Sequence, residues 1–265
     1  SLEHSTGQGL LRKIVEKGGR KFHEYVTTRA TEPDSNVINV LSVDGGGMRG
    51  IMPALLLSEI ETRTHMPSSK IFEMMAGTST GAILVSGLAV PSCAGSTEPL
   101  LRATDVVKLY AFDGPLIFQR RGLTSQCESL FDPCFLETKL HEIFCHGGQS
   151  YTMHDALSDV LIPAVNIPAV SLEEVPTTVW FQKRHDGHVK LYDIVRGSVA
   201  APSYFPAHSF EEYTLVDGGL RANNPARTAL SKARDAHVHD NTAPKFCVLS
   251  LGCGTFPNHH QVSRT

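Results

Sequence analysis

Two neighbouring segments of this sequence share one pattern, in which a short apolar run leads into a glycine-rich turn and then into a helix. The first segment covers residues 37–64, with Asp-Gly-Gly-Gly-Met-Arg-Gly at 44–50. The second covers residues 71–88, with Gly-Thr-Ser-Thr-Gly at 77–81. Short apolar runs suit parallel strands, because helices cover both faces of a parallel sheet. The pattern therefore predicts parallel strands that alternate with helices.

The rest of the chain extends this alternation, which favours an α/β sandwich. Residues 1–36 are expected to form a polar lead-in with one helix, around 10–26, and residues 37–265 a single domain. The stretch 114–148 gives mixed signals and is expected to be irregular and to cover part of the functional site. Further strands are predicted at 160–165, 177–182, 213–216 and 245–251, and further helices at 105–112 and 191–200.

Charge and hydropathy exclude two classes of protein. The formal net charge of -3 at pH 7 gives no broad attraction to nucleic acid. The basic stretch 12–21 is either a solvated helix end or a patch for lipid headgroups. No apolar run reaches the roughly 18–20 residues of a membrane-spanning helix. The best candidate, 82–90, stops at Pro91, so we expect neither a nucleic-acid partner nor a transmembrane segment.

The cysteine pattern bears on the compartment. Six cysteines without a C-x-x-C pair match neither a zinc site nor a small disulfide scaffold. We expect reduced, mostly buried thiols, which favour a cytosolic type of compartment. The first nine residues contain no apolar signal core. A chain that begins at Ser nevertheless leaves earlier trimming, and with it secretion, open.

The turn at 77–81 matches G-x-S-x-G at the point where a strand passes into a helix. Small neighbours at Gly77 and Gly81 would allow the sharp turn that lifts the Ser79 hydroxyl above the sheet. The start of the next helix would favour negative charge beside that hydroxyl. Ser79 is therefore a candidate nucleophile for acyl transfer. The alternative is an ordinary glycine-bounded turn with a capping serine.

The turn at 44–50 offers backbone N–H groups that no side chain shields. Donors held where a carbonyl oxygen becomes negative stabilise the transition state by about 3–4 kcal/mol each. We assign the N–H groups of Gly46 and Gly47 to such an oxyanion hole, and Arg49 to its support or to a phosphate headgroup. The turn also fits G-x-G-x-x-G, but a dinucleotide site needs an acidic residue about 20 positions on. Glu61 and Glu73 are not well placed for that role.

The third motif is Asp-Gly-Gly at 217–219, directly after a predicted strand. Asp217 at a strand end could reach Ser79 and accept its proton, provided that its pKa is raised. Alone, this pattern is also that of an Asx turn that ends a strand. A conventional esterase would use a histidine instead, and His208 is the best rival among the 13 histidines. We interpret His208 as a loop residue.

Together these segments resemble the patatin-like phospholipase family. The matching motifs keep the family's order from about residue 38 to 255. Cys253 stands where the family commonly has Thr. The motifs are Val-Leu-Ser-Val-Asp-Gly-Gly-Gly-Met-Arg-Gly at 40–50, Gly-Thr-Ser-Thr-Gly at 77–81, Ala-Ala-Pro-Ser-Tyr-Phe-Pro at 200–206, Asp-Gly-Gly at 217–219, Asn-Asn-Pro at 223–225 and Ser-Leu-Gly-Cys-Gly at 250–254.

The resemblance implies a three-layer α/β/α sandwich with a mainly parallel central sheet, and a Ser–Asp dyad that needs no metal or other cofactor. By position, Ser79 is the nucleophile, Asp217 the base, and Gly45, Gly46 and Gly47 with Arg49 the oxyanion hole. The nucleophile elbow is Gly77, Thr78, Thr80 and Gly81.

The implied activity is lipid acyl hydrolysis of the phospholipase A or lysophospholipase type. A transacylase on the same site and a catalytically silent lipid-binding module are the alternatives. The expected partner is a phospholipid or other acyl lipid, with peripheral membrane contact, in the cytoplasm or at a membrane. Family members usually continue with helices after the last strand, so we expect a C-terminal truncation.

Overall fold

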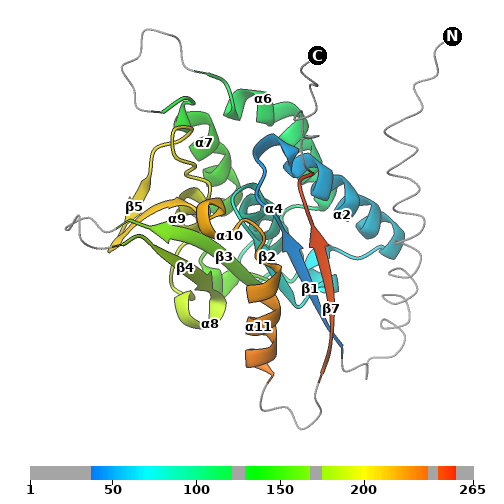
Figure 1. Ribbon diagram of the computed structural model, residues 1–265. Coiled ribbons are helices and arrows are strands. Elements are labelled where there is room, and N and C mark those ends of the chain that lie inside the picture. The colour runs from blue at the N-terminus through cyan, green and yellow to red at the C-terminus, as the bar shows by residue number, and fades with distance from the viewer. Residues whose placement is uncertain (1–36, 121–128, 168–174, 238–243, 255–265) are drawn as a thin grey trace, which may run out of the picture.

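A seven-stranded sheet runs through the molecule, and helices lie on both of its faces (Figure 1). The computed structural model describes residues 37–120, 129–167, 175–237 and 244–254. The helix expected around 10–26 and the basic stretch 12–21 lie outside them. The strands are β1 Val37–Val43, β2 Met74–Gly77, β3 Asp159–Asn166, β4 Thr177–Gln182, β5 His208–Phe210, β6 Tyr213–Asp217 and β7 Lys245–Leu251.

The helices fill the connections between these strands. Three short helical turns are η1 Gly47–Gly50, the π-helical η2 Leu109–Asp113 and η3 Met153–Asp155. The α-helices are α2 Ile51–Thr64, α3 Ser68–Ile71, α4 Thr80–Ala89, α5 Ala103–Lys108, α6 Gly114–Ile117, α7 Pro133–Phe144, α8 Lys183–Asp186, α9 Leu191–Ser198, α10 Gly219–Ala222 and α11 Ala226–Ala236. Within the described residues, none of these helices is long and apolar enough to cross a bilayer.

Side chains of β2 alternate between two cores, one on each face of the sheet. Met75 belongs to the larger core, beneath the fully buried helix α4. Met74 and Ala76 pack on the other face with Ala229 and Ala233 of α11. Figure 1 shows α11 in front of the sheet and α4 behind it. Strands β3, β2, β1 and β7 are parallel neighbours, so the expected three-layer α/β/α sandwich with a mainly parallel sheet is confirmed.

One edge of β3 is shared by two strands, and this positions the site. Strand β4 covers the opposite edge. On the shared edge, β2 pairs in parallel with residues 159–161, and β6 pairs antiparallel with residues 164–166. The carboxyl ends of β2 and β6 therefore point toward each other beside Pro163, which contributes no N–H that would need a partner. Gly77 and Asp217, the last residues of the two strands, converge as a result.

Several sequence-based boundaries need correction. The stretch 114–148, expected to be irregular, contains α6 and the 12-residue helix α7. Asp132 caps α7 by accepting a hydrogen bond from the Cys134 N–H, and Pro133 occupies the first helical position, two start signals that the mixed pattern concealed. The strand expected at 71–76 begins only at Met74, because α3 extends to Ile71. No element was expected over 226–236, where α11 lies.

The expectation of mostly buried thiols is wrong for the described residues. Of the five cysteines among them, only Cys253 is buried, while Cys93 and Cys134 are exposed and the other two are half-buried. All five are free thiols. The exposure of Cys93 and Cys134 follows from their positions, in a surface loop and on the first turn of α7.

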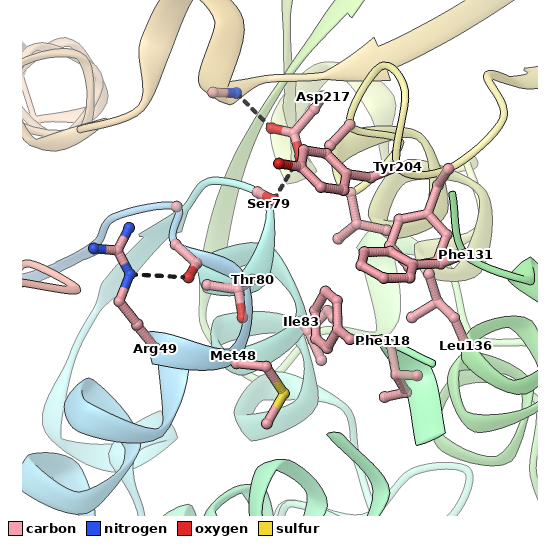
Figure 2. A pocket seen from close by; sticks show the side chains of 18 of the residues that line it. Met48, Arg49, Ser79, Thr80, Ile83, Phe118, Phe131, Leu136, Tyr204 and Asp217 are labelled. Carbon is pink, nitrogen blue, oxygen red and sulfur yellow. Dashed lines mark hydrogen bonds between the residues drawn. The ribbon is translucent and has the colours of Figure 1, made fainter. Parts of the chain in front are cut away.

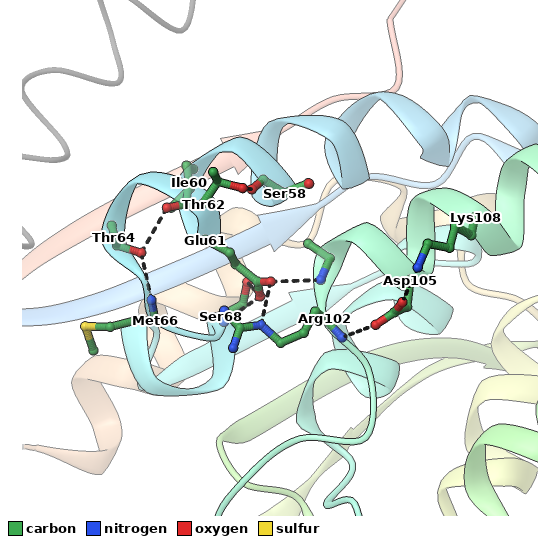
Figure 3. A network of polar contacts seen from close by, with 11 residues as sticks. Ser58, Ile60, Glu61, Thr62, Thr64, Met66, Ser68, Arg102, Asp105 and Lys108 are labelled. Atoms are coloured by element: carbon green, nitrogen blue, oxygen red, sulfur yellow. Dashed lines mark hydrogen bonds and ion pairs between the residues drawn. The ribbon is translucent and has the colours of Figure 1, made fainter.

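A buried carboxylate joins three helices beneath the sheet's edge (Figure 3). Glu61 of α2 accepts hydrogen bonds from the backbone N–H and hydroxyl of Ser68, both at 2.8 Å. It also accepts from Arg102 Nε at 3.0 Å and from the Ala103 N–H at 2.9 Å. Glu73 in turn accepts the Asn39 N–H at 2.7 Å. Both carboxylates therefore serve the fold, which leaves the dinucleotide interpretation without its ribose ligand.

Candidate active site

Ser79 lies in the turn between β2 and α4 with a strained backbone. Its φ of 54° and ψ of -119° belong to a region that costs a non-glycine residue about 1–3 kcal/mol. The flanking glycines make the turn possible by close packing. A Cβ on Gly77 would lie 2.2 Å from the Gly81 carbonyl oxygen, and a Cβ on Gly81 would lie 2.3 Å from the Val43 carbonyl oxygen. The local geometry is that of the expected elbow.

Asp217 meets Ser79 across the junction of β6 and β2 (Figure 2). The Ser79 hydroxyl donates to Asp217 Oδ2 at 2.6 Å. The Gly219 N–H donates to Asp217 Oδ1 at 2.7 Å, so each carboxylate oxygen accepts one hydrogen bond. The Asp217 residue is only 6% exposed. The Asx-turn alternative is thus also correct as local geometry, but the same carboxylate faces the serine hydroxyl.

Burial raises the pKa of Asp217 above its ordinary value, because a carboxylate loses hydration when it leaves water. The hydrogen bonds from Ser79 and Gly219 oppose this rise. A carboxylate with a raised pKa holds a proton more readily, which suits a group that accepts one from a serine hydroxyl. None of the described residues that line the surrounding cavity is a histidine. The interpretation of His208 as a loop residue is wrong, because it is the first residue of strand β5, where its Nε2 pairs with Asp193 Oδ1 at 2.9 Å.

The three glycines of the turn have two different roles. The Gly45 N–H donates to the Asn223 carbonyl oxygen at 3.2 Å, so Gly45 serves close packing rather than anion binding. A Cβ at Gly45 would lie 3.3 Å from the Ser79 Cβ. The N–H groups of Gly46 and Gly47 make no hydrogen bond with any other described residue, and both glycines line the cavity with Ser79. These two groups are the available donors.

Arg49 supports the glycine turn through contacts with two backbone carbonyl oxygens. Its Nε lies 3.5 Å from the Gly46 carbonyl oxygen, and a terminal nitrogen donates to the Gly254 carbonyl oxygen at 3.3 Å. These contacts hold the Arg49 side chain against the glycine turn, and Figure 2 labels Arg49 and marks its hydrogen bond with a dashed line. The side chain thus supports the turn as expected, and it also lines the cavity, where a headgroup could contact it.

Three further groups hold the elbow in place. The Thr78 hydroxyl donates to the Ala222 carbonyl oxygen at 2.7 Å. The Tyr110 hydroxyl pairs with the Thr80 hydroxyl and donates to the Thr80 carbonyl oxygen at 3.0 Å. Ser198 accepts the Ser79 N–H at 3.2 Å and donates to the Pro163 carbonyl oxygen at 2.7 Å. Sequence reasoning missed Tyr110 and Ser198, although Ser198 lies just before the Ala-Ala-Pro motif at 200–202.

The Ser79–Asp217 pair opens into a mainly apolar cavity of 680 Å³. The stretch 114–148 does line the site as expected, but through residues in and beside α6 and α7. Phe131 stacks on Tyr204 and meets Phe118 edge to face, each with ring centroids 5.6 Å apart. Figure 2 shows these rings to one side of Ser79. The apolar lining comprises Met48, Ile83, Leu109, Tyr110, Ile117, Phe118, Phe131, Leu136, Val199, Ala201, Pro202, Tyr204, Phe205 and Leu220.

The described residues contain no cluster of His, Cys, Asp or Glu that could hold a metal ion. The polar residues that line the cavity include Ser79, Asp217, the glycines of the turn, Arg49 and Asn223. A hydroxyl beside a buried base and two unpaired N–H groups can attack a carbonyl carbon and stabilise the resulting oxyanion.

Comparison with known proteins gives consistent matches. The family model described as "Patatin-like phospholipase" matches residues 41–230. "Patatin-like protein 2" of Oryza sativa subsp. indica is 31% identical over 260 residues, which cover 85% of this chain and 62% of that protein. "Probable inactive patatin-3-Kuras 1" of Solanum tuberosum is 29% identical over 243 residues, covering 83% of this chain and 63% of that protein. The chain thus spans about three-fifths of the length of these relatives.

Among solved structures, VipD from Legionella pneumophila aligns over 84% of this chain and 63% of its own. The TM-score is 0.43 and the sequence identity is 12%.

Proposed function

This chain belongs to the patatin-like phospholipase family, and on that premise we propose that it hydrolyses fatty-acyl ester bonds of lipids through Ser79 and Asp217. The observation that carries the proposal is the 2.6 Å hydrogen bond from the Ser79 hydroxyl to the buried Asp217 carboxylate. Residues 37–265 are the proposed catalytic domain. The proposed type is phospholipase A or lysophospholipase.

The reaction proceeds by two acyl transfers. Asp217 takes the Ser79 proton while Oγ attacks the ester carbonyl carbon, and the N–H groups of Gly46 and Gly47 hold the oxyanion. The carbonyl re-forms, the ester C–O bond breaks, and Asp217 returns the proton to the departing lyso-lipid alcohol. Water then attacks the acyl-Ser79 ester, again losing a proton to Asp217. Release of the fatty acid returns that proton to Ser79.

Several features of the site favour this chemistry. The helix α4 begins immediately after Ser79, and its N-terminus favours negative charge beside the reacting oxygen. The strain at Ser79 keeps its hydroxyl directed at Asp217 rather than buried in a regular helix. The buried position of Asp217 raises its pKa and so strengthens it as a base.

The cavity supports an acyl lipid as the substrate. Its volume of 680 Å³ falls within the ~300–1,000 Å³ that is usual for small-molecule sites. The aliphatic and aromatic lining offers an acyl chain an apolar environment that leads to the end with Ser79 and Asp217. Arg49 at this end suits the phosphate of a headgroup. We propose that the chain acts as a peripheral protein in the cytoplasm or at a membrane.

A serine-directed fluorophosphonate probe tests the proposal first. The wild-type protein and Ser86→Ala should be labelled, whereas Ser79→Ala should not. Ser86 is a suitable control because it is also a buried serine, on the same helix α4. Absence of labelling in the wild type would overturn the proposal and leave a catalytically silent lipid-binding module.

A panel of phospholipids and lysophospholipids then defines the reaction. Free fatty acid should accumulate in wild type, remain absent with Ser79→Ala, and be unaffected by a chelator. Addition of an acceptor lipid distinguishes the alternative, because a transacylase would form a new ester in place of free fatty acid.

A further inference from the structure

Exposed apolar side chains gather around the mouth of the cavity. Met48, Tyr204 and Leu220 line the cavity and yet are 36%, 49% and 59% exposed. Each of these residues therefore faces both the cavity and the solvent. They come from three separate parts of the chain, namely η1, the motif at 200–206 and α10.

Three further exposed side chains extend this rim. Leu130 donates its N–H to the Ser203 carbonyl oxygen at 2.8 Å, which places Leu130 beside Tyr204. The Gly114 backbone packs against the Met48 thioether, because a Cβ there would lie 2.6 Å from its sulfur. Phe112 and Leu116 lie four positions apart in the helical run that contains Gly114, so they project together from its outer face, opposite the Gly114–Met48 contact. We call Met48, Phe112, Leu116, Leu130, Tyr204 and Leu220 the mouth rim.

Contiguous exposed apolar surface marks an interaction site on a folded protein. Here the surface is continuous with the cavity proposed for an acyl chain, and this decides its partner. Acyl lipids that form bilayers expose almost none of their chains to water. Transfer of such a chain across a water layer would cost hydrophobic free energy, whereas a rim inserted among the headgroups gives it an unbroken apolar path.

We propose that the mouth rim docks on the surface of a phospholipid bilayer and opens the cavity toward the acyl chains. The proposal rests on the proposed function, whose site it connects to the membrane. Charged neighbours agree with it. Arg221 follows Leu220, and Arg120 forms a β-bridge with Phe131; both arginines are exposed. Two acids also lie here: Asp132 is exposed and caps α7, and Asp113 pairs with Lys139 at 3.5 Å. Basic groups at the rim suit an anionic lipid surface.

Vesicle binding by a Ser79→Ala protein separates docking from hydrolysis. The test variant adds Phe112→Ser and Leu116→Ser, which are 74% and 48% exposed and do not line the cavity. The matched control adds Leu55→Ser and Val175→Ser, which are 42% and 69% exposed outside the rim. Sedimentation with phosphatidylcholine vesicles, with and without phosphatidylserine, gives the partition coefficients.

We expect the test variant to bind vesicles roughly tenfold more weakly than the control, because binding scales with the apolar area inserted. In the active background, the same pair of changes should slow hydrolysis of vesicle phospholipid in parallel. Hydrolysis of a monomeric short-chain ester should stay within about twofold of wild type, since neither side chain lines the cavity.

Equal vesicle binding by the test and control variants would overturn the docking proposal, as would an equal loss on the monomeric ester. If the wild type hydrolysed no ester at all while rim-dependent vesicle binding persisted, the proposed function would fail and the docking surface would stand.

Discussion

Two buried carboxylates in this protein differ in the hydrogen-bond donors that surround them. Glu61 is 5% exposed and accepts four hydrogen bonds, one of them from the Arg102 guanidinium. Asp217 is 6% exposed and accepts two, from a hydroxyl and a backbone N–H, and no cation contributes to its pKa. Figures 2 and 3 show the two environments.

The difference shows how solvation, rather than burial, separates the structural carboxylate of Glu61 from Asp217, the proposed base. The donors around Glu61 replace the water that it lost, so this side chain holds α2, α3 and α5 together through four hydrogen bonds. The donors around Asp217 replace only part of that water, so burial raises its pKa. Hydrogen-bond donors therefore make Glu61 a structural link between helices, whereas the smaller number of donors at Asp217 leaves its pKa raised.

The strongest challenge to this comparison is removal of the Asp217 charge. Asp217→Asn and Ser79→Ala should each lower kcat/KM by at least ~10³-fold, since both groups act as one unit. Asp217→Asn should retain or raise the melting temperature, because the folded protein no longer carries a poorly solvated charge. Lipid hydrolysis and thermal unfolding measure the two effects. A folded Asp217→Asn protein with near-wild-type activity would refute the role of the base.

Substitution of Gly46 tests the other half of the site. A Cβ at this position would lie 2.3 Å from the Cys253 Cβ, so Gly46→Ala must displace the turn and its N–H donors. Loss of one such donor costs about 10²–10³-fold in kcat. The double variant Gly46→Ala with Cys253→Gly removes the clash and should recover most of the rate. Failure of this rescue would mean that the glycine turn contributes something other than correctly placed donors.

The Glu61 site should respond in stability rather than in rate. Glu61→Gln removes the charge that pairs with Arg102. It also places an NH₂ group, itself a donor, opposite N–H and O–H donors. Charged hydrogen bonds contribute about 1.5–3 kcal/mol each, so we expect the free energy of unfolding to fall by about 2–3 kcal/mol. Denaturant titration measures this loss, and kcat/KM of the folded protein should stay within about twofold. A large loss of kcat/KM without loss of stability would contradict a purely structural role for Glu61.

The pH dependence of hydrolysis reports on the protonation of Asp217. Hydrolysis requires ionised Asp217, so kcat/KM should fall about tenfold per unit of pH below the Asp217 pKa. The acidic limb should lie above 3.8, the ordinary value, because burial raises that pKa. The ionised form is the less favourable one in the folded state, so the stability contributed by Asp217 grows as the pH falls through its folded pKa. An acidic limb at or below pH 3.8 would contradict the raised pKa of Asp217.

The smallest effect is expected at Ser198, a positioning residue. Ser198→Ala leaves the Ser79 N–H and the Pro163 carbonyl oxygen without their shared partner. We expect kcat to fall about threefold to tenfold with KM nearly unchanged, because a neutral hydrogen bond contributes about 1 kcal/mol. Ser198→Thr keeps the hydroxyl and should recover part of the rate. Equal losses in Ser86→Ala would show that Ser198 acts only through packing.

Local signals account for much of what the sequence predicted. Apolar runs predicted the positions of β1, β3, β4, β6 and β7. The glycines around Ser79 predicted a tight turn, and a Cβ at Gly77 or Gly81 would clash there. Motif order led to the family and to both Ser79 and Asp217. The same local view failed where signals were mixed or weak: it left α7 as irregular chain and assigned nothing to α11, the layer on the second face of the sheet.

By itself, the sequence determined an α/β chain of a recognisable family, with Ser79 in a glycine-bounded turn and Asp217 at a strand end. The tertiary structure decided that β2 and β6 share one edge of β3, which brings together two residues 138 positions apart. It also decided that the Gly45 N–H is occupied by Asn223 and that Ser198 holds the turn. The physical reason is that a local pattern records which conformation a segment prefers, whereas the choice of pairing edge depends on how all the strands and both cores pack at once.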